Sequence, residues 1–200
     1  MTSHKCFISF KTENMDYKEK LEKLKIDMID KSLKTPINSK DQDYIMRVIR
    51  RDYLQDSTVT IHLIGQHSAE NSRDEFGRQE DQYYIKKELQ ASLYNSDLSH
   101  KSGILGVVLP EMNPQVFQGS YKCSICGNQH NKVMIDDNSV VKEFSYNYYI
   151  PKDSGCAWRE NDRYCVLVNW SDFIGSPESF IDQAYQKRED PIANKTKVHP

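Results

Sequence analysis

The sequence predicts a three-layer α/β fold in which helices cover both faces of a parallel sheet of about five strands. The segments STVTIHLIG (57–65) and SGILGVVLP (102–110) are almost continuously apolar, as expected of strands that are buried on both faces. Helical patterns lie before, between and after these runs, and strands that alternate with helices are typical of a parallel sheet. The expected architecture is flavodoxin-like, with strand order 2-1-3-4-5.

The first half of the chain supplies the remaining early elements. CFISF (6–10) is a short apolar run of the buried-strand type, and an amphipathic helix is expected from Met15 to about Lys25. A short second strand is expected near Ile26–Ile29, ending at Asp30. SKDQDYIMRVIRRDYL (39–54) predicts another helix, with Ser39 or Asp41 as its N-cap.

The second half departs from this pattern between Glu111 and Arg163. This stretch is rich in Asn, Tyr, Ser and Gly, and we expect an irregular insertion that carries a small hairpin around Val140–Ile150. RYCVLVNW (163–170) restores a buried strand, and SPESFIDQAYQKRED (176–190) predicts a final helix with Ser176 as its N-cap. The chain is therefore expected to be one domain, residues 1–190, followed by a mobile tail, residues 191–200.

Composition excludes several classes of function. Lys and Arg number 27 against 29 Asp and Glu, so no basic excess favours nucleic-acid binding. No apolar run approaches the ~20 residues of a membrane span. The N-terminus has no export signal, so we expect a cytoplasmic protein with reduced thiols. The phosphate-binding patterns GxGxxG and GxxxxGK[ST] and the nucleophile pattern GxSxG are all absent.

Tyr84 and Glu88 draw attention within YYIKKELQASL (83–93), because they lie one helical turn apart beside an apolar face. In a doubly wound sheet, ligands bind outside the carboxyl ends of the strands, where strand order reverses. With order 2-1-3-4-5, that crevice lies between the first and third strands, and the helix that carries Glu88 begins at the same rim. The other candidates at the strand ends are Ser9, Phe10, Lys11, Asp30, Ser32, Gly65 and Gln66.

The chain also resembles a known family. KCFISF (5–10), MIDKSL (28–33), DYIMRVIRRDYLQDSTVTIHLIG (43–65), the aromatic-x-x-x-Glu helix and GILGVVLP (103–110) are similar to the TIR-like domains of Thoeris anti-phage systems. The resemblance covers roughly residues 4–110. Its most specific parts are the DSTV junction with LIG at the strand end, and the spacing from there to Glu88. The usual aromatic of the pair is Trp, and this sequence has Tyr84 instead.

The resemblance implies an enzyme that cleaves NAD and makes a cyclic or otherwise modified ADP-ribose signal. It implies that Glu88 is catalytic and that Ser9, Phe10, Asp30, Ser32 and Tyr84 contact the substrate. It also implies a set of partners: NAD as substrate rather than as a resident cofactor, a downstream effector that responds to the product, a phage protein as trigger, and self-association. Nucleic acid and membranes are not expected partners.

The chemistry suits a carboxylate. Breaking the nicotinamide–ribose bond develops positive charge on the ribose, as in glycoside hydrolysis, and a negative side chain stabilises that charge.

Two other interpretations of the function stay open. A non-catalytic TIR module would act through self-association or partner binding, and Tyr84 in place of Trp is compatible with it. A nucleoside deoxyribosyltransferase-like enzyme would share the fold, but no matching motif supports it.

The cysteines offer a metal site as an alternative to reduced structural thiols. Cys123 and Cys126 form a CxxC pair, and either Cys156 with Cys165 or His130 could complete a zinc site. Eight residues separate Cys156 from Cys165, which is unusual for a zinc knuckle. We therefore expect no metal, and an insertion that is held together by its aromatic residues: Phe144, Tyr146, Tyr148, Tyr149 and Trp158.

Overall fold

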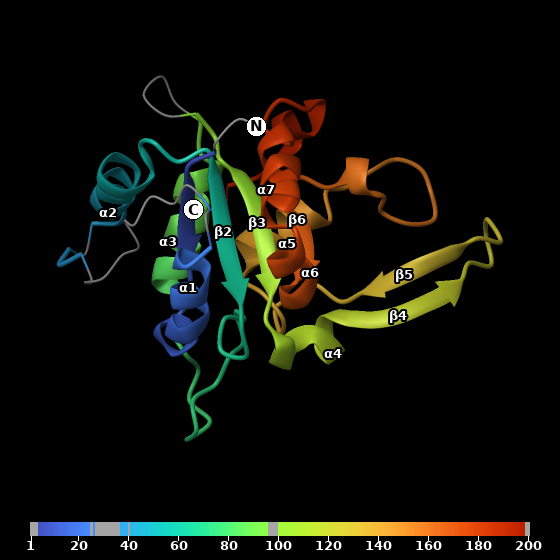
Figure 1. Ribbon diagram of the computed structural model, residues 1–200, viewed down its shortest axis with the longest axis horizontal. Helices are drawn as coiled ribbons and strands as arrows, with labels where there is room; N and C mark the ends of the chain where they lie inside the picture. The colour runs from blue at the N-terminus through green and yellow to red at the C-terminus, as the bar shows by residue number, and fades with distance from the viewer. Residues whose placement is uncertain (1–3, 25, 27–36, 40, 96–99, 199–200) are drawn as a thin grey trace.

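The computed structural model describes residues 4–24, 26, 37–39, 41–95 and 100–198. Within these residues, four parallel strands form the main sheet in the order β1-β2-β3-β6 (Figure 1). The strands are β1 (Cys6–Ser9), β2 (Val59–Ile64), β3 (Gly103–Val108) and β6 (Val166–Asn169). They correspond to the first, third, fourth and fifth expected strands, so the α/β prediction is confirmed. The expected second strand near Ile26–Ile29 lies almost entirely outside the described residues.

Helices cover both faces of the sheet. On one face lie α2 (Gln42–Val48), its π-helical continuation η2 (Ile49–Leu54), α3 (Tyr83–Leu93) and α5 (Lys142–Tyr148). On the other face lie α1 (Met15–Glu22), α6 (Trp170–Gly175) and α7 (Pro177–Gln186). Alternate strand residues enter separate apolar clusters, because successive side chains point to opposite faces. All six residues of β2 and of β3 are buried, as their continuous apolar runs predicted.

Several helix boundaries follow from local chemistry. Asp41 caps α2, since its Oδ1 accepts hydrogen bonds from the backbone N–H groups of Asp43 and Tyr44. Ser176 occupies the N-cap position of α7, but its side chain makes no capping hydrogen bond. None of the helices formed by the described residues is long and apolar enough to cross a membrane.

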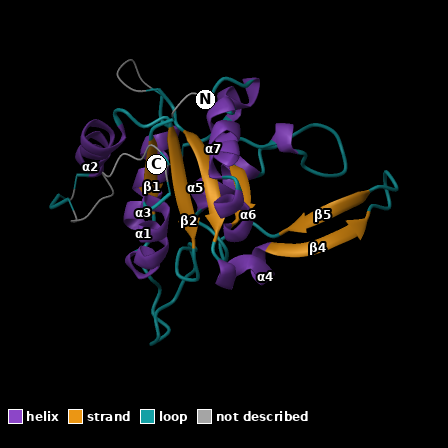
Figure 2. Ribbon diagram, in the orientation of Figure 1, coloured by secondary structure: helices purple, strands orange, loops and turns teal. Residues whose placement is uncertain are grey.

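The region between β3 and β6 differs from its expected form. The hairpin predicted around Val140–Ile150 is wrong, because α5 lies there and buries Val141, Phe144 and Tyr148 against α3 and the sheet. These residues recur at helical spacing, a pattern that the abundance of Tyr and Asn obscured. The actual hairpin consists of β4 (Phe117–Lys122) and β5 (Gln129–Val133). It extends away from the main sheet beyond β6 (Figures 1 and 2) and is reached through η3 (Pro110–Met112) and α4 (Asn113–Val116).

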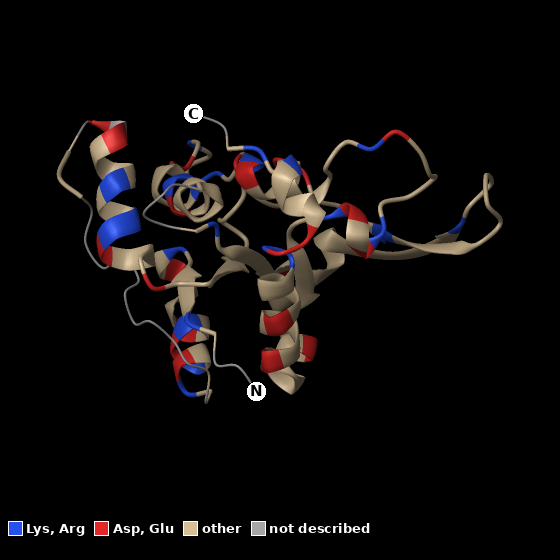
Figure 3. Ribbon diagram, turned by 90° about the horizontal axis from the view of Figure 1, so that it is seen from above, with Lys and Arg blue, Asp and Glu red and all other residues tan. Residues whose placement is uncertain are grey.

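The last elements are short. η4 (Glu160–Asp162) precedes β6. η5 (Pro191–Lys195) lies in the segment expected to be a mobile tail, and its Ile192 and Ala193 are buried. The Lys101 ammonium donates a 2.7 Å hydrogen bond to the Ala193 carbonyl, and the Lys197 N–H donates to Asn147. Seen from above in Figure 3, basic and acidic residues are interspersed along the helices rather than gathered into one basic band.

Candidate functional site

Helix α3 carries Glu88 into the interior of the fold. The helix begins near the carboxyl ends of the strands and packs over β1, β2 and β3, where Ile85, Leu89 and Leu93 join the core. One turn beyond Glu88, the Ser92 hydroxyl lies 2.7 Å from the Thr60 hydroxyl of β2. This hydrogen bond sets the position of α3 along the strands. The Glu88 side chain therefore points into the protein, and the residue is only 5% exposed. This burial excludes a solvated surface residue.

The environment of Glu88 changes its ionisation. Burial disfavours the charged form and raises the pKa of Glu88 to about 8, and contact with the Ser9 side chain offsets this only in part. The carboxyl group is therefore mainly protonated at neutral pH in the unliganded protein. Strongly shifted carboxyl groups of this kind are concentrated at functional sites.

Two further buried polar side chains lie beside Glu88 on the same face of the sheet. Ser9 ends β1, and its register partner in β2 is His62, whose own partner in β3 is Gly106. Ser9 Oγ and both ring nitrogens of His62 make no hydrogen bond of good geometry within the structure. Burial lowers the pKa of His62 to about 4, with a small opposing effect from the Ser9 carbonyl. His62 is thus a core histidine whose ring nitrogens lack a hydrogen bond of good geometry among the described residues.

Tyr84 lies one turn closer to the rim than Glu88. Its ring is half-buried and meets Tyr83 edge to face at a centroid distance of 5.5 Å. Its hydroxyl donates a 3.4 Å hydrogen bond to the Ile37 carbonyl, which ties α3 to the chain just before α2. The Tyr84 ring is thus held one turn before Glu88, at the N-terminal end of α3.

A charged group at the rim was missed by the sequence analysis. The Glu80 carboxylate, just before α3, lies 3.2 Å from Lys11 Nζ and 3.3 Å from His67 Nδ1. Lys11 follows β1 and His67 follows β2, so Glu80 joins the carboxyl ends of these two neighbouring strands. No sequence signal reveals this contact, because its members are far apart along the chain.

The remaining residues that were predicted to contact the substrate are Phe10, Asp30 and Ser32. Phe10 packs against the apolar cluster on the opposite face of the sheet, so the structure does not bring it to Glu88. Alternation along β1 explains this, since Ser9 points towards α3 and its neighbour points away. Asp30 and Ser32 lie outside the described residues.

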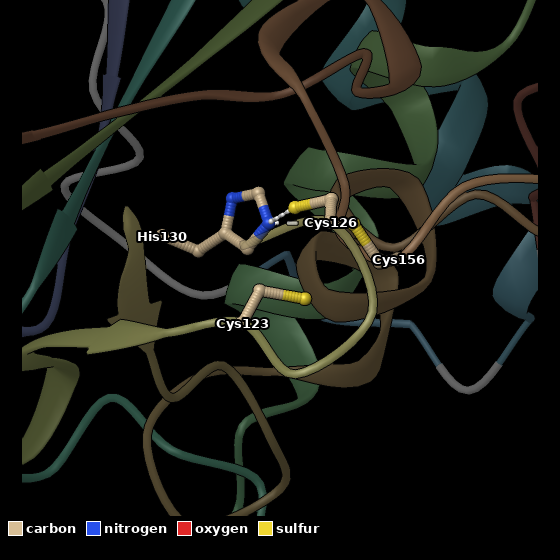
Figure 4. Close-up of side chains that lie close together, drawn as sticks. All are labelled: Cys123, Cys126, His130 and Cys156. Atoms are coloured by element: carbon tan, nitrogen blue, oxygen red, sulfur yellow. Dashed lines mark hydrogen bonds between the residues drawn. The ribbon is translucent and has the colours of Figure 1, made fainter. Parts of the chain in front are cut away.

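A second cluster lies at the far end of the β4–β5 hairpin. The side chains of Cys123, Cys126, His130 and Cys156 bring one donor atom each to within 4.8 Å of one another (Figure 4). Cys165, the other cysteine considered for a metal site, is absent from this group. Its thiol is buried in the core beside the Phe144 carbonyl at 3.8 Å, and burial raises its pKa.

Comparison with known proteins identifies the family. The chain matches the model of the TIR-like domain of Thoeris protein ThsB over residues 7–113, which include β1, β2, β3 and the helix that carries Glu88. Comparison with curated proteins and with solved structures gives no match. The matched region is more than half of the chain and contains α3 together with the strands β2 and β3 against which it packs. The chain therefore belongs to the family of Thoeris ThsB TIR-like domains.

Proposed function

We propose that this protein cleaves the nicotinamide–ribose bond of NAD and makes a cyclic or otherwise modified ADP-ribose signal for anti-phage defence. The observation that carries the proposal is Glu88, a buried carboxyl group one turn from Tyr84 on the helix that packs against the sheet. Membership of the Thoeris family supports a role in defence. The product would act on a downstream effector, and a phage protein would serve as trigger.

In the proposed reaction, the bond between the ribose carbon and the ring nitrogen of nicotinamide breaks heterolytically. Nicotinamide leaves as a neutral molecule with the bonding electron pair, and positive charge develops on the ribose. The Glu88 carboxylate stabilises that charge, and its burial strengthens the interaction. A nucleophile then bonds to the ribose carbon and loses its proton. Water gives hydrolysis, whereas a group of the same nucleotide gives a cyclic product.

Ionisation of Glu88 is coupled to substrate in this mechanism. The unliganded site favours the neutral acid, because burial raises the pKa of Glu88 to about 8. The nicotinamide ring of NAD is cationic, and a cation within a few ångströms favours the carboxylate. Substrate would therefore displace the proton from Glu88. The buried Ser9 hydroxyl beside it would bind a ribose hydroxyl.

Incubation of the purified protein with NAD tests the proposal directly. We expect nicotinamide to accumulate, with a larger rate when extract from phage-infected cells supplies the trigger. Calorimetric titration with NAD measures binding independently of turnover. The competing reading is a non-catalytic TIR module that acts through self-association. Neither NAD binding nor nicotinamide release, with or without infected-cell extract, would favour that module and refute the enzyme.

Tyr84→Ala is expected to reduce NAD cleavage roughly 10- to 100-fold, because its ring shapes the mouth of the site one turn from Glu88. Tyr84→Phe is the matched control, since it keeps the ring and loses only the long hydrogen bond to Ile37. Steady-state rates and melting temperatures should be measured for both variants. If Tyr84→Ala lowers the melting temperature while its folded fraction retains normal activity, the ring serves packing alone.

A further inference from the structure

We propose that Cys123, Cys126, His130 and Cys156 bind one structural zinc ion that joins the β4–β5 hairpin to the loop before β6. Three thiols and one imidazole are a common ligand set for structural zinc, and they fill all four tetrahedral positions. A closed site of this kind leaves no position for substrate. The metal would therefore act on the architecture of the region rather than on the NAD chemistry, and the proposal does not depend on that chemistry.

The donor geometry fits a zinc tetrahedron. His130 Nε2 lies 3.1 Å from Cys126 Sγ and 3.3 Å from Cys156 Sγ. Zinc bond lengths place ligand sulfur and nitrogen about 3.5 Å apart, and two ligand sulfurs about 3.8 Å apart. The longest separation among the four donors is no more than 4.8 Å, so small side-chain rotations close the tetrahedron. Figure 4 shows the sulfur atoms converging on the same side of the imidazole ring.

The local backbone is built as a zinc knuckle. Cys123 and Cys126 flank the turn between β4 and β5, and the Gly127 N–H donates a 2.9 Å hydrogen bond to the Cys123 carbonyl. Gly127 has φ +73°, a conformation that a side chain would strain. The backbone N–H groups of Cys126 and Ile125 point to the Cys123 sulfur. His130 follows in β5, close to both cysteines of the knuckle.

The fourth ligand comes from a separate loop. Cys156 follows Gly155, which has φ +99°, in the segment between α5 and β6. A 2.7 Å ion pair between Lys152 and Asp162 closes the base of this loop. Cys156 therefore stands at the outer part of a constrained loop, 26 residues beyond His130 in sequence but 3.3 Å from its ring. Such convergence needs a physical cause, because surface loops otherwise find few contacts to hold them.

The aromatic residues that were expected to hold the insertion together lie towards its near end. The Tyr149 hydroxyl donates a 2.6 Å hydrogen bond to Val133 at the base of β5, and Tyr149 meets Trp158 edge to face at 5.3 Å. Phe144 and Tyr148 lie still deeper, in the core. Beyond these contacts, every residue of β4 and β5 is exposed or half-buried. A two-stranded hairpin is marginal in water without further support, and a metal at the far end supplies it.

The zinc would also maintain a concave surface. A hollow of about 820 Å³ lies between the hairpin and the loop, lined among others by Lys132, Tyr148, Trp158 and Arg163. His130 belongs to its wall as well as to the cluster. The hairpin and the loop are the two sides of this hollow, and the four donors join them at the outer end. Loss of the metal would allow the sides to separate.

Metal analysis decides the proposal. Protein without a polyhistidine tag, purified under reducing conditions without chelators, is expected to carry one zinc per chain. Cys123→Ser and Cys156→Ser should each lose it, whereas Cys165→Ala should keep it, because that thiol lies in the core outside the cluster. Cobalt added to metal-free wild-type protein should give the thiolate charge-transfer and intense visible bands of a tetrahedral site, a readout that needs no variant.

Limited proteolysis reports the structural consequence. Chelation of the zinc should expose residues 117–133 and 151–163 to rapid cleavage, while the main sheet and its helices remain resistant. Zinc content below one tenth of an equivalent, together with no cobalt spectrum in reduced wild-type protein, would overturn the proposal. Retention of full zinc content by Cys156→Ser would overturn the joining of hairpin and loop.

Discussion

Glu88→Gln is expected to reduce the rate of NAD cleavage by about 10²- to 10³-fold while leaving the fold intact. The substitution keeps the size of the side chain and removes the negative charge that the developing ribose cation requires. Initial rates of nicotinamide release, measured over a range of NAD concentrations, give the change in kcat and in kcat/KM. Because Gln is neutral like the protonated acid of the unliganded site, NAD binding should weaken less than turnover.

Glu143→Gln provides the matched control for this experiment. Glu143 is a second buried carboxyl group on the same side of the sheet, and it accepts a 2.8 Å hydrogen bond from Gln90. A Gln at this position can accept the same bond, and we assign it no part in the chemistry. Its activity should stay near that of the wild type. Equal activity of Glu88→Gln and wild type would refute the assignment of Glu88.

The elements predicted correctly are those with strong local signals. β2 and β3 follow from continuous apolar runs, and α3 follows from Ile85, Leu89 and Leu93 at helical spacing. Once these elements are ordered in a parallel sheet, Glu88 falls beside the crevice by topology alone. The burial of Glu88 could not be predicted, because it depends on how closely α3 packs over Ser9 and His62.

The β4–β5 hairpin gave no usable signal. Its strands, FQGSYK and QHNKV, are mostly polar and exposed on both sides, so neither an apolar face nor strict alternation marks them. The second cysteine pair was also misleading. Cys165 lies in the apolar context of β6 and is buried, whereas His130, the alternative ligand, lies in the cluster with Cys156. Sequence spacing identifies candidate ligands that share one turn, such as Cys123 and Cys126. It does not show that a distant loop, here the one that carries Cys156, lies beside them.

Glu88→Gln is also expected to stabilise the protein at neutral pH, by roughly 3 kcal/mol at pH 7. The folded protein holds the Glu88 proton with a pKa of about 8, against 4.5 for the ordinary side chain. Between these two values the folded state binds more protons than the unfolded state, so wild-type stability falls as pH rises through that window. Gln has no proton to lose, and its contribution does not change.

The difference in stability between the two proteins should therefore be small at pH 4.5, grow steadily to about pH 8 and then level off. Chemical denaturation at several pH values measures it. His62, which burial keeps neutral down to about pH 4, affects both proteins equally and cancels from the comparison. Glu178→Gln, at an exposed position in α7, controls for the loss of one surface charge and should change stability little at any pH.

A difference between Glu88→Gln and wild type that does not depend on pH would mean that Glu88 is ionised in the folded protein. A stabilised but inactive Glu88→Gln variant would show instead that burial of this acid lowers the stability of the fold, as expected of a group retained for catalysis.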